Sequence, residues 1–66
     1  MAKIVILGAG DGGRLLSQLL KEQKDTEIIG FIDDNKGIQG KDINGYKVVG
    51  TSGDLKRFRK TGFVVA

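Results

Sequence analysis

Four glycines occupy six consecutive positions near the start of the chain, between an apolar run and an amphipathic one. Three of them, Gly8, Gly10 and Gly13, fit the pattern G-x-G-x-x-G. In that pattern the first glycine permits a tight turn, the second lets a phosphate approach the backbone, and the third lets a helix pack closely on a strand. Free N–H groups at the start of such a helix attract an anion. We therefore expect a phosphate-bearing ligand at Gly8, Ala9, Gly10, Asp11, Gly12 and Gly13.

Two adjacent carboxylates, Asp33 and Asp34, follow the second apolar run of the chain. Asp33 comes 20 residues after Gly13, at the strand tip from which a carboxylate accepts hydrogen bonds from a ribose hydroxyl. Asp34 is either a second ligand contact or a turn residue. Neighbouring side chains that leave a strand tend to point apart, so we do not expect the pair to share a proton for catalysis. The combined pattern favours a nucleotide-containing ligand, whereas the alternative is a glycine stretch that only makes a tight turn.

Two charged side chains lie close to the proposed phosphate position. Asp11 would repel a diphosphate unless it faces away, so we expect it to face solvent or to bind a sugar hydroxyl or amine. Arg14, in the first turn of the helix, is either a compensating positive charge or an ordinary surface residue.

The composition excludes several kinds of site and compartment. The chain has no cysteine and no histidine, which excludes disulfides, thiolate metal sites and an imidazole base. Its net charge is +3, and the basic cluster "KRFRK" at 56–60 is interpreted as a solvated helix face, so we expect no nucleic-acid partner. No apolar run approaches the roughly 18 residues of a membrane span, and the start lacks a signal-peptide pattern. We expect a cytoplasmic protein without membrane insertion.

Alternating strands and helices must position these residues. The predicted elements are a strand over 4–7, a helix from Gly12 or Gly13 to near Lys24, a strand over 28–32, a loop over 35–46 with a tight turn at Asn44-Gly45, a strand over 46–50, a helix that starts with a capping box from Thr51 to Asp54, and a strand over 63–66. We expect the leucines of the first helix to pack on Ile4, Ile6 and the second strand; these are Leu15, Leu16, Leu19 and Leu20.

This order predicts an α/β fold of one domain over residues 1–66. Right-handed crossovers give a Rossmann-like three-layer parallel sheet with strand order 3-2-1-4, which binds ligands beyond the carboxyl ends of its strands. We expect this nucleotide-binding domain to be incomplete, truncated at its C-terminal end.

The stretches "KIVILGAGDGGRLL", "EIIGFIDDN" and "GKDINGYKVVG", with "DL" in the next helix, resemble the N-terminal domain of bacterial sugar O- and N-acyltransferases. That family contains sialic-acid O-acetyltransferases and UDP-4-amino-sugar N-acetyltransferases. "GFIDDN" followed 15 residues later by G-x-x-V-x-G is more specific than the glycine pattern, and the resemblance covers the whole chain. It differs where family members commonly have glycine-glycine-histidine after "GAG", since this chain has Asp11, Gly12 and Gly13.

The resemblance implies a Rossmann-like domain that holds a nucleotide sugar such as a UDP-sugar, with Gly8 and Gly10 on the phosphate side and Asp33 and Asp34 as nucleotide contacts. In that family a left-handed β-helix follows this domain, binds acetyl-CoA and supplies the catalytic histidine. The parent protein would then be an acetyl-CoA-dependent sugar acetyltransferase of surface-polysaccharide biosynthesis, a homotrimer assembled through the β-helix. The 66 residues would bind the substrate without catalysing, and acetyl-CoA would bind outside them.

Two alternatives remain open at this point. "GDGGR" is also similar to the glycine loop of capsule-type sugar-nucleotide dehydratases and epimerases, in which "GAGDAG"-like loops and "GFIDDD"-like strand ends occur. The glycine pattern alone also permits an NAD-binding redox domain.

Overall fold

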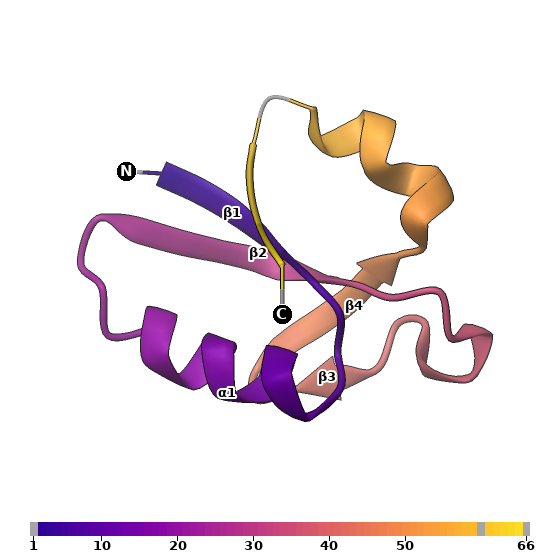
Figure 1. Cartoon of the computed structure of the whole chain (residues 1–66), viewed down its shortest axis with the longest axis horizontal. Coiled ribbons are helices and arrows are strands. Elements are labelled where there is room, and N and C mark those ends of the chain that lie inside the picture. The colour runs from indigo at the N-terminus through magenta and orange to yellow at the C-terminus, as the bar shows by residue number, and fades with distance from the viewer. Residues whose placement is uncertain (1, 60, 66) are drawn as a thin grey trace.

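The computed structural model of this 66-residue protein describes residues 2–59 and 61–65. Strands and helices alternate along the chain as expected (Figure 1), except that the strands at 42–43 and 46–50 follow one another directly. The elements, with η for a 3₁₀ helix, are β1 (Ala2–Leu7), α1 (Asp11–Leu20), β2 (Thr26–Ile32), η1 (Lys36–Ile38), β3 (Asp42–Ile43), β4 (Tyr46–Gly50), η2 (Ser52–Phe58) and β5 (Gly62–Val65). The strand predicted over 63–66 is thus present as β5, while Ala66 lies outside the described residues.

One five-stranded sheet, of order β3-β4-β2-β1-β5, forms the centre of the molecule. β1 runs parallel to β2 and β5, and β2 runs parallel to β4. The predicted α/β class and the Rossmann-like, mostly parallel sheet are confirmed. The strand order differs from the expected 3-2-1-4 because β3, which the sequence did not reveal, adds antiparallel to β4 at the edge.

The extra strand arises from the turn at Asn44-Gly45. Both residues have positive φ, 56° and 89°, and a two-residue turn of this kind matches the twist of paired antiparallel strands. Residues 42–43 therefore fold back onto β4, and the segment predicted as a loop over 35–46 contains η1 and β3.

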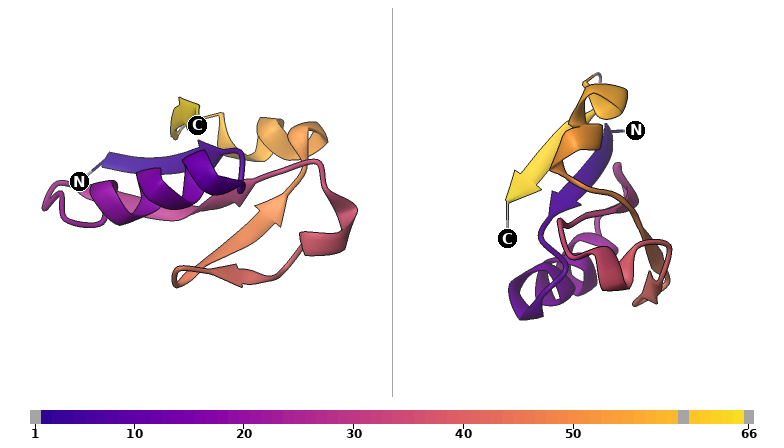
Figure 2. Two further views of the ribbon diagram at one scale, coloured as in Figure 1. Left: turned by 60° about the horizontal axis from the view of Figure 1, so that its bottom comes forward. Right: turned by 90° about the vertical axis from the view of Figure 1, so that its right-hand side faces the viewer.

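The two main helices cover opposite faces of the sheet. In the right-hand view of Figure 2, α1 lies below the strands and η2 above them. This follows from right-handed crossovers, because the connection from β1 to β2 and the connection from β4 to β5 move across the sheet in opposite directions. α1 ends at Leu20 and not near Lys24, since residues 21–25 form the turn that brings Thr26 beside Ala2.

The buried core lies in the central strands. β1 and β2 contribute continuous buried runs, as expected of parallel strands covered on both faces. Among the residues whose burial the structure describes, the buried hydrophobic ones are Ile4, Val5, Ile6, Ala9, Ile28, Phe31, Ile32 and Val48.

The orientation of α1 differs from the prediction. Leu15 and Leu19 are 58% and 62% exposed, so the expected packing of these two side chains on β1 and β2 is wrong. The residues of α1 that are buried are Gly13 and Ser17, and Leu20 packs against the core from the same side.

Small residues explain this rotation of the helix. Gly13 and Ser17 are one turn apart, and without bulky side chains they let the helix approach the sheet closely. The buried Ser17 hydroxyl donates to the Arg14 carbonyl at 2.7 Å and accepts from Asn44 Nδ2 at 3.2 Å. The β3–β4 turn therefore holds α1 with its Ser17 side inward.

Candidate functional site

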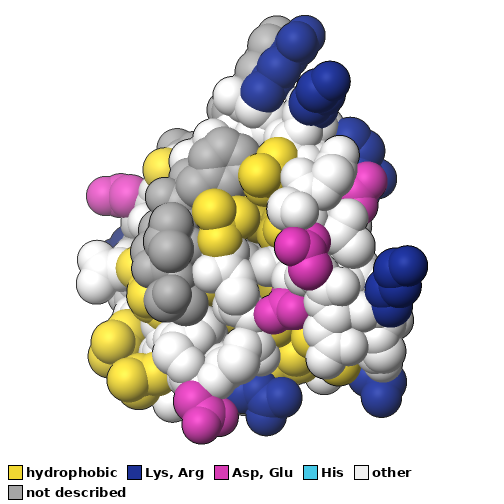
Figure 3. All heavy atoms as spheres, turned by 45° about the vertical axis from the view of Figure 1, so that its right-hand side comes forward, with side chains coloured by type: hydrophobic (Ala, Val, Ile, Leu, Met, Phe, Trp, Pro, Cys, Tyr) yellow, Lys and Arg dark blue, Asp and Glu magenta, His cyan; other side chains and the backbone are white. Residues whose placement is uncertain are grey.

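A cleft of about 370 Å³ opens at the carboxyl ends of β1 and β2, where open parallel sheets bind their ligands. In Figure 3, acidic side chains lie next to hydrophobic ones near the centre of the face shown. The residues that line the cleft are Leu7, Gly8, Ile32, Asp33, Asp34, Ser52 and Leu55. Of the residues that the sequence analysis expected to contact a ligand, Gly8, Asp33 and Asp34 line this cleft, and residues 9–13 do not.

The glycines after β1 differ in whether backbone conformation or packing requires a glycine. Gly8 has a φ of +108°, a conformation that only glycine adopts readily, and its N–H donates to the Ile32 carbonyl at 2.8 Å. Gly13 is buried in α1. Gly10 has an ordinary φ of −79°, and a Cβ there would meet no protein atom within 4 Å. Neither backbone conformation nor packing therefore requires a glycine at position 10.

The N-terminus of α1 faces outward beside this loop. Gly10 is the N-cap and provides no side-chain hydrogen bond, and the first N–H groups of any helix lack intrahelical partners. Asp11 and Gly12 are exposed in the first turn, so Asp11 is positioned to face solvent. Arg14 remains beside the loop, because its Nε donates to the Ala9 carbonyl at 3.3 Å.

Asp33 links the end of β2 to the glycine loop. Its Oδ2 accepts from the Ala9 N–H at 2.8 Å, and its Oδ1 accepts from the Asn35 N–H at 2.9 Å. These bonds, that from Ala9 first, hold the pKa of Asp33 below its ordinary value of 3.8, against a smaller effect of burial. A carboxylate has about four acceptor sites, so the ionised Asp33 retains capacity for further donors.

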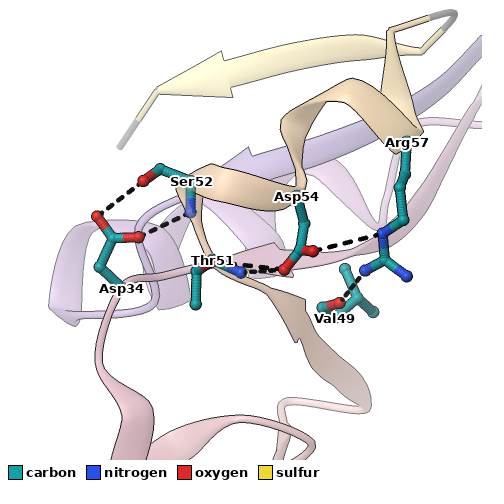
Figure 4. Close-up of polar contacts among 6 residues, drawn as sticks. All are labelled: Asp34, Val49, Thr51, Ser52, Asp54 and Arg57. Carbon is teal, nitrogen blue, oxygen red and sulfur yellow. Dashed lines mark hydrogen bonds and ion pairs between the residues drawn. The ribbon is translucent and has the colours of Figure 1, made fainter.

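Asp34 binds a different segment, the start of η2 (Figure 4). Its Oδ1 accepts from the Ser52 N–H at 2.7 Å, and its Oδ2 accepts from the Ser52 hydroxyl at 3.1 Å. The bonds from Ser52 lower the pKa of Asp34, while burial and the charge of Asp33 oppose the shift. The two neighbouring aspartates therefore hold separate segments and share no proton.

Several residues of this site were missed by the sequence analysis. Ser52 and Leu55 line the cleft from η2, and Gln39 Nε2 braces the backbone after β2 by donating to the Asp33 carbonyl at 2.6 Å. The predicted capping box at Thr51 and Asp54 is present. Because β4 runs parallel beside β2, the start of η2 after β4 lies at the same edge of the sheet as the end of β2. The predicted strand order could therefore have indicated Ser52 as a residue of the site.

Other kinds of site are not visible in the part of the chain that the structure describes. Its residues include no group of three or more potential metal-ligating side chains. Within the same residues, no helix has the length and apolar character needed to cross a bilayer.

Comparison with known proteins gives one family. The family model described as the PglD N-terminal domain matches residues 3–66. The match includes the glycine stretch, both aspartates and the capping box of η2. No curated protein matches the chain.

Proposed function

The chain belongs to the PglD N-terminal domain family, a family of sugar acetyltransferase N-terminal domains, and from this membership we propose that it binds the nucleotide part of a nucleotide-sugar substrate. The ligand class is a UDP-sugar used in surface-polysaccharide synthesis. Its diphosphate lies across residues 8–13, and its ribose meets Asp33.

The observation that carries this proposal is the free space at Gly10. Gly8 is explained by its positive φ and Gly13 by its burial. At Gly10, the N-cap of α1, no protein atom and no positive φ requires a glycine, and serine or aspartate would cap the helix at least as well. A ligand phosphate that approaches the backbone is a physical reason for a missing side chain at this position. The outward-facing N–H groups at the start of α1 supply donors and a favourable dipole for that anion.

Asp33 supports the choice of a ligand with a free ribose hydroxyl. Its carboxylate is ionised and fixed by two backbone N–H groups, with acceptor capacity remaining. A ligand with a 2′-phosphate would place a second anion beside Asp33 and Asp34. Lys36 is the cation nearest in sequence that would reduce this repulsion.

The parent protein, on the same proposal, transfers an acetyl group from acetyl-CoA to the sugar in the cytoplasm. Acetyl-CoA and the catalytic residues belong to a β-helix outside these 66 residues, through which the parent assembles as a homotrimer. The chain itself contributes substrate binding and no catalytic residue.

Calorimetric titration tests the proposal. We expect UDP and a UDP-sugar to bind detectably and NADPH to bind far more weakly than either. Gly10→Ala should weaken UDP binding about tenfold or more, which corresponds to about 1.4 kcal/mol, while the melting temperature stays unchanged because the new Cβ meets open space. Asp33→Ala should also weaken binding.

Opposite results would reject the assignment. Tight NADPH or NADH binding would favour the redox alternative. If neither Gly10→Ala nor Asp33→Ala changes the UDP affinity, UDP does not bind at this edge of the sheet.

A further inference from the structure

We propose that Asp34 is a positioning residue of the cleft rather than a direct contact of the nucleotide. Its carboxylate holds the start of η2 beside the end of β2, and thereby places Ser52 and Leu55 as one wall of the cleft. This inference rests on the proposed nucleotide-binding function and deepens it.

The first argument is that both oxygens of Asp34 bind the first residue of η2. Oδ1 and Oδ2 accept from the N–H and the hydroxyl of the same residue, Ser52, at 2.7 and 3.1 Å. Figure 4 shows the carboxylate facing Ser52 across the space between the two segments. The Ser52 N–H is one of the donors that a helix leaves free at its start, so this bond fixes the backbone at the start of η2 and not only a side chain.

The second argument is that η2 carries a lining residue directly above this bond. In a 3₁₀ helix the residues i and i+3 lie over one another, and Leu55 is three positions after Ser52. Both residues line the cleft, together with Asp34 itself. A displacement of Ser52 would therefore displace Leu55 as well.

The other polar contacts of η2 do not replace Asp34. Asp54 accepts from the Thr51 N–H at 2.8 Å, within the start of the helix. Arg57 Nη2 donates to the Val49 carbonyl at 2.8 Å, and its Nε lies 3.7 Å from Asp54 Oδ1. These contacts tie η2 to itself and to β4 (Figure 4). Among the described residues, Asp34 makes the side-chain hydrogen bonds that join η2 to the end of β2.

Two substitutions separate positioning from direct contact. Asp34→Asn removes the charge but keeps an oxygen for the Ser52 N–H and an amide that donates to the Ser52 hydroxyl. Ser52→Pro removes both donors of residue 52 and leaves Asp34 intact. Proline is favoured at the first helical position, and the extended backbone of Thr51, with φ −107° and ψ 177°, suits a residue before proline.

The experiment is a titration of the whole chain with UDP, using wild type, Asp34→Asn, Asp34→Ala, Ser52→Pro and the Asp34→Ala/Ser52→Pro double variant. We expect the UDP affinity of Asp34→Asn to lie within about threefold of wild type. Asp34→Ala and Ser52→Pro should each bind UDP about tenfold more weakly, because displaced Ser52 and Leu55 no longer hold the ligand in the right geometry. The double variant should lose no more than either single variant, because both remove the same contact.

A direct nucleotide contact predicts the opposite pattern. Asp34→Asn would then lose as much affinity as Asp34→Ala, and Asp34→Ala would weaken binding further in the Ser52→Pro background. Either result overturns the inference.

Amide hydrogen exchange of Ser52 tests the Asp34–Ser52 hydrogen bonds without any ligand. We expect faster exchange in Asp34→Ala and protection close to wild type in Asp34→Asn. Equal exchange in all three proteins overturns the inference even if UDP binds. If exchange is faster only in Asp34→Ala, the positioning role of Asp34 is supported even when wild type fails to bind UDP. Failure to bind UDP would then count against the proposed function alone.

Discussion

Gly30 is the residue at which β2 and β4 approach too closely for a side chain. A Cβ there would lie 2.5 Å from the Lys47 carbonyl oxygen and 2.8 Å from Val49 Cγ1. Because the first of these atoms is backbone, relief requires the strands to separate. We predict that Gly30→Ala lowers the free energy of unfolding by about 1–3 kcal/mol, measured by urea denaturation.

Gly10→Ala is the matched control for this prediction. Its Cβ would meet open space at an ordinary φ, and we expect the free energy of unfolding to change by less than about 0.5 kcal/mol. Equal losses from the two substitutions would contradict the close strand contact at Gly30, because the reduced flexibility of the unfolded chain that both substitutions cause stabilises the protein.

The two aspartates also make stability depend on pH. Both carboxyl groups have a pKa below 3.8 in the folded protein, so the folded state favours the ionised form. Their contribution is complete above the ordinary pKa of 3.8 and is lost as the pH falls through the lower, folded-state values. We predict that the urea midpoint falls as the pH is lowered from 5 to 2.5.

An Asp33→Asn/Asp34→Asn double variant should show a flatter dependence on pH than wild type. A midpoint that rises on acidification, or curves that coincide for the two proteins, would contradict the assigned hydrogen bonds.

For single residues, the sequence predicted the place of a residue in the fold better than its hydrogen-bond partners. Spacing alone placed Gly8 at the turn and Asp33 at the strand tip. It could not predict that Asp33 holds the Ala9 N–H or that Asp34 holds Ser52, since the latter bond joins residues 18 apart that become neighbours only when β4 pairs with β2.

Among the elements, α1 carries a direct test of its orientation. Leu19 is exposed, whereas Leu20 packs against the core. We predict that Leu19→Ala changes the free energy of unfolding by less than about 0.5 kcal/mol. Leu20→Ala, which is partly buried, should cost about 1–2 kcal/mol, below the range for a fully buried leucine.

Urea denaturation of both variants measures the difference, with each protein serving as the control for the other. A larger loss from Leu19→Ala than from Leu20→Ala would mean that the helix presents its leucine pair to the sheet after all.

The buried face of α1 was predicted wrongly because the prediction considered only the hydrophobicity of the side chains. Four leucines at 15, 16, 19 and 20 cover a wider arc than the sheet buries. The spacing of Gly13 and Ser17 one turn apart was the missing signal for the inner face. Ser17 tolerates burial because Asn44, from a hairpin distant in sequence, completes its hydrogen bonds.

For the molecule as a whole, alternation of strands and helices predicted the class, the parallel pairing and the opposite placement of the two helices, because crossover handedness leaves few arrangements. β3 escaped prediction since a strand of two residues has too few positions to show a hydrophobic period. Its tight turn at Asn44-Gly45 was recognised, but not the pairing that this turn permits.

The two borders of the sheet are unequal in a way that bears on assembly. One border is β3, two residues long and set antiparallel beside a tight turn, with the charged pair Asp42 and Lys47 in register. Short and charged edges discourage the addition of another strand. The opposite border is β5, a parallel strand over Gly62–Val65. A further strand, from the same polypeptide or from another, would therefore add more readily beside β5 than beside the β3–β4 hairpin.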